Sequence, residues 1–165
     1  MTYHKPVLLA ESIEGLNIKP DGIYVDVTFG GGGHSKEILK NLKNGFLYGF
    51  DQDLDAEKNS IKSNNFKFIR SNFRYIKNFL RLEGVKKIDG LIADLGISSF
   101  QIDTPKRGFA HKHDSIIDMR MNVDSDFGAK DILNSYSEVE IARVFYDYGD
   151  IKQSRKIAKL IVKER

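Results

Sequence analysis

Four consecutive glycines, at positions 30–33, constrain the fold of this chain more than any other feature of its sequence. They follow a β-branched and aromatic run typical of a strand, residues 23–28, and precede a segment with helical spacing, residues 34–42. Glycines at such a junction permit positive φ angles and let backbone N–H groups approach a ligand without a Cβ in the way. The positive end of the following helix points at the same loop. The loop predicts a site for a nucleotide-like cosubstrate, with a flexible turn as the simpler alternative.

Strand-like and helix-like segments alternate along the first two-thirds of the chain. The pattern predicts further strands over residues 46–50, 66–69 and 87–93, and helices over residues 54–63 and 75–82. This alternation predicts an α/β fold with a parallel sheet.

The pattern changes after residue 94. Residues 95–130 are rich in turn-forming residues, and two amphipathic helices are predicted after them, the first closed by Gly149. The apolar face of the first is expected to hold Ile141, Val144, Phe145 and Tyr148, and that of the second Ile157, Leu160 and Ile161.

Composition excludes several classes of protein. The chain has 165 residues, no cysteine and a formal net charge of +3, with 41% hydrophobic and 30% charged residues. This balance argues against disorder and fibrous repeats, and the length allows one domain. Without cysteine there is no disulfide framework and no thiolate zinc site, and we expect a cytoplasmic protein. No run of apolar residues is long enough for a membrane-spanning helix.

Two aspartates follow predicted strands. Asp51 lies 21 positions after Gly30, where an acid can accept hydrogen bonds from both hydroxyls of a ribose. Asp94 ends the fourth predicted strand, and two serines and Gln101 follow it. Ligands of open α/β sheets bind beyond the carboxyl ends of the strands, so these groups suit binding or chemistry. The alternative for Asp94 is a helix or turn cap.

The sequence predicts no metal site. Three aspartates alternate with other residues in the manner of a calcium loop: Asp51, Asp53 and Asp55. An EF-hand needs glycine next and glutamate at its twelfth position, where this chain has Ala56 and Lys62. The second and third aspartates are therefore expected to be solvated charges near a helix start. His111 and His113 have no cluster of further ligands at metal-binding spacing, which favours a loop or RNA contact.

The last 14 residues are strongly basic. They contain one acid, Glu164, against six basic side chains: Lys152, Arg155, Lys156, Lys159, Lys163 and Arg165. A helix with this composition could lie along a phosphate backbone, or the charges could form an ordinary solvated face.

Several stretches occur in the order found in one enzyme family. They are residues 4–11 (HKPVLLAE), 21–26 (DGIYVD), 28–35 (TFGGGGHS), 50–53 (FDQD), 94–99 (DLGISS), 107–109 (RGF), 118–121 (DMRM), 134–136 (NSY) and 148–150 (YGD). Together they make the chain resemble the RsmH (MraW) family, the S-adenosylmethionine-dependent methyltransferases that act on a cytidine of small-subunit ribosomal RNA. The DMRM stretch combined with the glycine loop is far more specific than any single motif.

This resemblance implies S-adenosylmethionine as cosubstrate. It implies these binding residues: Gly32, Gly33, His34, Asp51, Phe73, Asp94 and Gln101. The three loop residues would line the methionine end, Asp51 would hold the ribose, and Phe73 would flank the adenine. The last two would complete the pocket. The implied partner is 16S rRNA in the small ribosomal subunit, and the implied product is a cytidine of the decoding region methylated on its exocyclic amine.

The resemblance also implies the domain organisation. Residues 1–104 would form an incomplete Rossmann-like class I methyltransferase domain with the first four strands of its sheet. Residues 105–165 would form a truncated part of a helical insertion that recognises the substrate. Members of the family continue into a second half that finishes the sheet. We therefore expect a truncated amino-terminal half whose fourth strand is an exposed edge.

Three functions remain open from the sequence. The first is the methyltransferase; the second is a non-catalytic remnant that binds a nucleotide or RNA. The third is a nicotinamide-dependent oxidoreductase, against which Ser35 argues, because it replaces the third glycine of the dinucleotide fingerprint. Asp94 and the serines after it are candidate catalytic bases, among which the sequence does not choose. It gives no oligomeric state.

Overall fold

The computed structural model describes residues 6–165, so His4 and Lys5 of the first family stretch lie outside the described residues. The chain divides into two compact units, Met1–Phe100 and Gln101–Arg165, which are described separately. The functional division expected after residue 104 stays a prediction. Within residues 6–165, no helix combines the length and apolar character needed to cross a membrane.

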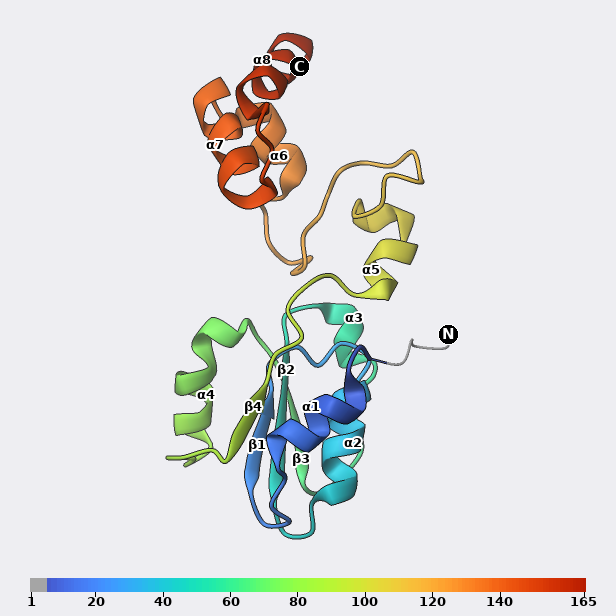
Figure 1. Cartoon of the computed structure of the whole chain (residues 1–165), viewed down its shortest axis with the longest axis vertical. Helices are drawn as coiled ribbons and strands as arrows, with labels where there is room; N and C mark the ends of the chain where they lie inside the picture. Colours follow the sequence, from blue (N-terminus) through green and yellow to red (C-terminus); the bar gives the residue numbers. More distant parts are fainter. Residues whose placement is uncertain (1–5) are drawn as a thin grey trace. The chain divides into compact units, whose positions relative to one another are not determined.

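The first unit is built on a four-stranded parallel sheet in the order β3-β2-β1-β4 (Figure 1). Its strands are β1 (Ile23–Asp26), β2 (Phe46–Asp51), β3 (Phe66–Arg70) and β4 (Gly90–Ile92). Tyr24 of β1 lies opposite Leu47 of β2 and Gly90 of β4. The chain moves outward from β1 to β3 and then crosses to the other side of β1, which makes β1 the switch point of the sheet. The predicted α/β fold with a parallel sheet is confirmed.

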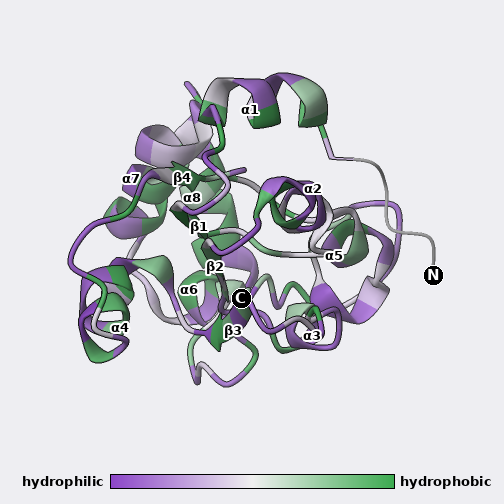
Figure 2. Ribbon diagram, turned by 90° about the horizontal axis from the view of Figure 1, so that it is seen from below, coloured by the Kyte–Doolittle hydropathy of each residue, from purple (hydrophilic) through white to green (hydrophobic). Residues whose placement is uncertain are grey.

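Helices cover both faces of this sheet, as seen along the strands in Figure 2. One face carries α1 (Leu9–Leu16), α2 (Gly33–Asn41) and α3 (Leu54–Glu57). The other face carries α4 (Ile76–Leu82), which follows the short 3₁₀ helix η1 (Phe73–Tyr75).

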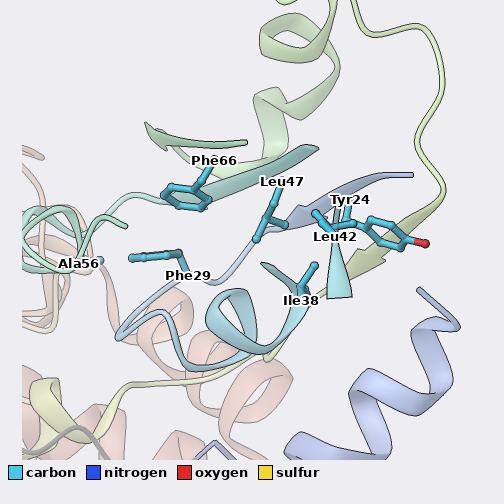
Figure 3. Close-up of a cluster of buried hydrophobic side chains, with 7 residues drawn as sticks. All are labelled: Tyr24, Phe29, Ile38, Leu42, Leu47, Ala56 and Phe66. Carbon is cyan, nitrogen blue, oxygen red and sulfur yellow. The ribbon is translucent and has the colours of Figure 1, made fainter. Parts of the chain in front are cut away.

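A buried cluster lies between the sheet and the helices of the first face (Figure 3). Its members are Tyr24, Phe29, Ile38, Leu42, Leu47, Ala56 and Phe66. Successive strand residues point to opposite faces, so Val25 packs instead with Phe50 and Leu80 on the side of α4. Ile38 and Leu47 are completely buried, which stabilises the fold by about 1.5–3 kcal/mol per side chain. The two cores, one on each face, hold the sheet in place and so position the carboxyl ends of its strands.

Some element bounds were predicted wrongly. The pattern did not predict α1, and α3 spans four residues instead of residues 54–63. Only Ala56 of α3 is buried, so the segment lacks the apolar face that holds a longer helix in place. The fourth strand covers Gly90–Ile92 instead of residues 87–93.

The second unit is helical. A short helix, α5 (Ser99–Asp103), crosses from the first unit into it, followed by η2 (Pro105–Arg107), α6 (Ala129–Ser135), α7 (Glu138–Gly149) and α8 (Ser154–Glu164). α7 begins with a capping box, in which Ser137 N donates to Glu140 Oε2 at 2.8 Å and Glu140 N donates to Ser137 Oγ at 3.3 Å. α7 and α8 pack through Ile141, Ala142 and Ala158.

The two amphipathic helices confirm the prediction, but three details differ. Gly149 remains inside α7, and Asp150 supplies the left-handed cap with φ 52°. Tyr148 lies in the last turn, where the chain reverses toward α8, and its side chain is 87% exposed. Leu160 is half exposed, so the buried face of α8 is narrower than the spacing indicated.

A network around Asp118 holds the irregular segment between η2 and α6. Arg120 donates from Nε to Asp118 Oδ1 at 2.8 Å and from Nη2 to Asp118 Oδ2 at 2.7 Å. The buried Arg107 donates from Nη2 to the carbonyl oxygen of Arg120 at 2.8 Å. Ala129 N, at the start of α6, donates to the carbonyl oxygen of Asp118 at 2.9 Å. The DMRM stretch is therefore a structural tie within this unit.

Replacing Asp118 with asparagine tests this network. The guanidinium of Arg120 lowers the pKa of Asp118 from 3.8 to about 2. Because the pKa is lower in the folded chain, the carboxylate stabilises the fold above pH 3.8, and this contribution is lost as the pH falls through about 2. We expect Asp118→Asn to lower the free energy of unfolding by ~1 kcal/mol at neutral pH, a value reduced for solvent screening. The difference should shrink as the solution is acidified.

Urea unfolding followed by circular dichroism measures this difference at each pH. Asp114→Asn is the matched control, because Asp114 lies exposed in the same segment and has no ion pair among residues 6–165. An effect of Asp118→Asn that equals the control or ignores pH would contradict a stabilising role for the pair.

Candidate functional site

The glycine loop joins β1 to α2 at the carboxyl edge of the sheet. Gly32 N donates to the carbonyl oxygen of Phe29 at 2.7 Å, which closes a tight turn over the buried ring of Phe29. Gly32 has φ 72°, and a Cβ there would lie 2.8 Å from Phe29 Cζ. A Cβ on Gly33 would lie 2.3 Å from Pro6 Cγ. Both positions need glycine, because the chain packs against them too closely for a side chain.

Among the described residues, the start of α2 has backbone N–H groups that are not capped. Gly32 occupies the N-cap position, and within the described chain no side chain caps the helix. The N–H groups of the first helical turn then lack intrahelical acceptors, which favours polar or negatively charged groups of a ligand. His34, in that turn, is buried, and its Nε2 has no hydrogen-bond partner among residues 6–165.

A buried acid at the end of β1 fixes both ends of the loop. Asp26 is 1% exposed and accepts hydrogen bonds from Ser35 Oγ at 2.7 Å and from Thr28 N at 3.1 Å. Burial raises the pKa of Asp26, and the hydrogen bonds from Ser35 and Thr28 oppose that rise. Sequence reasoning missed this residue, although an acid in an apolar strand run was a signal for it. Ser35, at the third-glycine position, ties α2 to the strand.

Asp51 reaches the loop from the neighbouring strand. It is the last residue of β2, and its Oδ2 accepts from Gly30 N at 2.8 Å while its Oδ1 accepts from Asp53 N at 2.9 Å. Burial raises the pKa of Asp51, and these two N–H groups oppose the rise. Each carboxylate oxygen has a second lone pair, so the side chain can accept further hydrogen bonds from a ligand.

The expectation that Asp53 is a solvated charge was wrong. Asp53 is 5% exposed and is the N-cap of α3, with its Oδ1 accepting from Asp55 N at 3.0 Å. Asp55 pairs with Lys58 at 2.6 Å on the surface. The cap explains the burial, because the side chain folds back over the first turn of the helix.

The end of β3 brings an aromatic ring toward the same edge. Ser71 N donates to the carbonyl oxygen of Asp51 at 2.9 Å, and Asn72 Nδ2 donates to Gln52 Oε1 at 3.0 Å. These contacts hold the turn after β3 against the turn after β2. Phe73 begins η1 directly afterwards and is 43% exposed, which leaves a ring face for stacking.

Asp94 lies beyond the end of β4. Val27 N donates to the carbonyl oxygen of Ile92 at 3.0 Å, but the next donor, Asp94 N, turns to Thr28 Oγ1 at 2.7 Å. The side chain of Thr28 thus replaces the backbone ladder at the carboxyl end of β4, where the strand stops at Ile92. The carboxylate of Asp94 is exposed and has no hydrogen bond or ion pair within the described residues, so the capping alternative is not seen.

The structure brings six of the seven expected binding residues to one edge of the first unit: Gly32, Gly33, His34, Asp51, Phe73 and Asp94. They follow the ends of β1, β2, β3 and β4. Gln101 belongs to the second unit and is buried in α5. Its place in the pocket, and the binding role of all seven, stay predictions. In the described part of the chain, no three His, Asp or Glu side chains are grouped to hold a metal ion.

Known proteins match the whole chain. The family model described as the MraW methylase family matches residues 1–165. The chain is 58% identical to ribosomal RNA small subunit methyltransferase H of Cytophaga hutchinsonii, an alignment covering 99% of this chain and 55% of that protein. It is 57% identical to the protein of that name from Parabacteroides distasonis, covering 99% and 54%, and 54% identical to that from Bacteroides thetaiotaomicron, covering 100% and 55%. The chain spans about half the length of the curated relatives it matches.

Alanine substitutions at Gly32 in the loop, and at Gly84 and Gly15 outside it, separate the cost of a positive φ from the cost of a steric clash. Gly32 and Gly84 both have positive φ, 72° and 73°, but only at Gly32 does a Cβ meet a buried ring. Gly15, in α1, has open space around its Cβ and no positive φ. We expect Gly84→Ala to lower the free energy of unfolding by about 1–2 kcal/mol and Gly32→Ala by more. Gly15→Ala should leave it unchanged or raise it by up to about 1 kcal/mol.

Thermal and urea unfolding of the three variants measures these differences. If Gly32→Ala costs no more than Gly84→Ala, the ring of Phe29 leaves room for a side chain at Gly32. A loss with Gly15→Ala as large as the other two would point to a general sensitivity to glycine replacement.

Proposed function

We propose, because the chain belongs to the MraW methylase family, that it is part of an S-adenosylmethionine-dependent methyltransferase acting on ribosomal RNA. The observation that carries this proposal is the match of the family model to residues 1–165, which include the glycine loop at the switch point of the sheet. The relatives' names specify small-subunit ribosomal RNA, and we propose the same substrate for the protein containing this chain. We further propose the exocyclic amine of a cytidine in the decoding region of 16S rRNA as the methyl acceptor, and a cytoplasmic location beside that substrate.

The residues of the first unit fit S-adenosylmethionine. At Gly32 and Gly33 the backbone packs against Phe29 and Pro6 with no room for a Cβ, and His34 Nε2 is a buried polar atom without a partner among the described residues. Such an atom is costly unless a ligand satisfies it, by about 1–3 kcal/mol. We propose that these three residues hold the methionine end. The carboxylate of Asp51 would accept from the ribose hydroxyls, and the half-exposed ring of Phe73 would contact the adenine.

The cosubstrate supplies an electrophilic methyl group on a sulfonium, so the protein's main task is alignment of the acceptor with that group and exclusion of water. The lone pair of a cytidine amine is conjugated with the ring, which makes it a weak nucleophile. An oxygen acceptor near the amine would help it to pyramidalise and then take its proton. Asp94 is suited by its exposed carboxylate, and Ser98 and Ser99 are further candidates on the same segment.

The second unit has a separate role in this proposal. We propose that residues 1–104 bind the cosubstrate and that residues 105–165 contribute to recognition of the RNA. Gln101, at the junction, would complete the pocket. Among the other functions, a nicotinamide oxidoreductase has least support, because the residue at the third-glycine position is engaged with Asp26.

Methyl incorporation tests the proposed reaction. We expect radiolabel from S-adenosylmethionine to appear in 16S rRNA when the protein is incubated with small ribosomal subunits that lack the modification. The chain itself and the full-length protein from C. hutchinsonii should be assayed in parallel, since the chain spans about half of that relative. Cosubstrate binding without incorporation by the chain would favour the non-catalytic alternative. Absence of both in the chain and its relative would overturn the proposal.

Replacing Asp51 tests the ribose assignment. We expect Asp51→Ala to weaken S-adenosylmethionine binding by roughly 10- to 100-fold in calorimetry, because charge-assisted hydrogen bonds are lost. Asp55→Ala removes a partly buried carboxylate of α3 that pairs with Lys58, and it should leave the affinity unchanged. Circular dichroism shows whether both variants fold. An unchanged affinity of a folded Asp51→Ala would remove Asp51 from the site.

A further inference from the structure

α8 and the turn before it carry basic side chains that have no role in the proposed methyl transfer. Four of them form what we call the α8 stripe: Lys152, Arg155, Lys156 and Lys159. All four are exposed. Arg155, Lys156 and Lys159 share one side of α8, because residues one, three and four positions apart lie within about a third of a turn, and they span about 6 Å. Lys152 lies in the turn directly before the helix.

The opposite side of α8 is occupied by the core of the second unit. Ala158 is completely buried, and Ile161 and Val162 pack against the cluster that includes Ile141 of α7. This packing fixes the rotation of α8 about its axis. The stripe therefore faces away from α7, toward solvent.

The structure separates the stripe from two other basic residues of the terminal segment. Arg165 donates from Nη1 to the carbonyl oxygens of Tyr136 at 2.8 Å and Leu133 at 3.1 Å, and so serves the end of α6. Lys163 Nζ forms an ion pair with Glu164 Oε1 at 3.7 Å. The four residues of the stripe have no ion pair within residues 6–165. Like charges on one helix side repel each other, so this surface gains from a partner with closely spaced negative charges.

We propose that the α8 stripe binds the phosphate backbone of the RNA, an inference that rests on the proposed function. Unpaired cations on about one turn of α8 and in the turn before it can contact more than one phosphate of a strand. An anionic membrane is less suited, because amphipathic helices enter membranes by their apolar face, and that face of α8 is used against α7. Contacts of this kind position an RNA without reading its bases.

A double substitution in the full chain tests the stripe. Lys156→Gln with Lys159→Gln removes two charges while keeping good helix formers. The matched control is Lys77→Gln with Lys86→Gln, two exposed lysines of the first unit without ion pairs among the described residues. The probe is a short fluorescent single-stranded RNA, titrated by anisotropy at several salt concentrations. We expect the stripe variant to bind roughly tenfold more weakly at about 0.1 M salt, and the slope of log affinity against log salt to fall by about 1.4.

The control variant should change neither the affinity for the RNA nor its salt dependence. Equal behaviour of stripe and control variants, or a wild-type chain that does not bind RNA, would overturn the inference. Phosphatidylserine vesicles form a second arm: binding to vesicles and not to RNA, lost in the stripe variant, would replace RNA with a membrane. Calorimetry with S-adenosylmethionine on the same proteins separates the two proposals. Cosubstrate binding with stripe-independent RNA binding defeats the stripe alone. Stripe-dependent RNA binding, with no cosubstrate binding by either the chain or the full-length relative, defeats the methyltransferase assignment alone.

Discussion

The candidate site depends on one buried hydrogen bond, from Ser35 Oγ to the carboxylate of Asp26. Burial of an acid at the end of β1 is costly, as its raised pKa shows, and the hydroxyl of Ser35 and the N–H of Thr28 offset part of that cost. Because Thr28 precedes the glycine loop and Ser35 follows it, a single carboxylate sets the separation of the two ends. The loop held in this way contains Gly32, with its positive φ, and leads into the first turn of α2, which no side chain of residues 6–165 caps.

Hydrogen bonds also connect the turns that follow neighbouring strands at this edge of the sheet. Asp51 accepts from Gly30 N, Ser71 N donates to the carbonyl oxygen of Asp51, and Asp94 N donates to Thr28 Oγ1. The turns after all four strands are therefore linked to β1 directly or through one neighbour. These links hold the polar groups of the four turns in fixed positions relative to one another. The two apolar cores on the faces of the sheet support the turns from below.

Sequence patterns predicted the parts of this arrangement that depend on local spacing. β-Branched and aromatic runs located the four strands, helical spacing located α2 and α4, and the order of strands and glycines placed Asp51 near the loop. The contact between Asp26 and Ser35 was not predictable in that way, because it depends on the conformation of the loop between them. α1 was missed, and the role of Asp118 and Arg120 emerged only from contacts with Arg107 and Ala129, which no short-range pattern encodes.

The double use of Asp51 limits how this site can change over evolution. Its carboxylate positions Gly30 and Asp53 from within the protein while offering its remaining lone pairs outward. A substitution of Asp51 would remove the acceptor of Gly30 N and so release the glycine loop. A variant at this position therefore keeps the conformation of the loop only if another acceptor replaces the carboxylate.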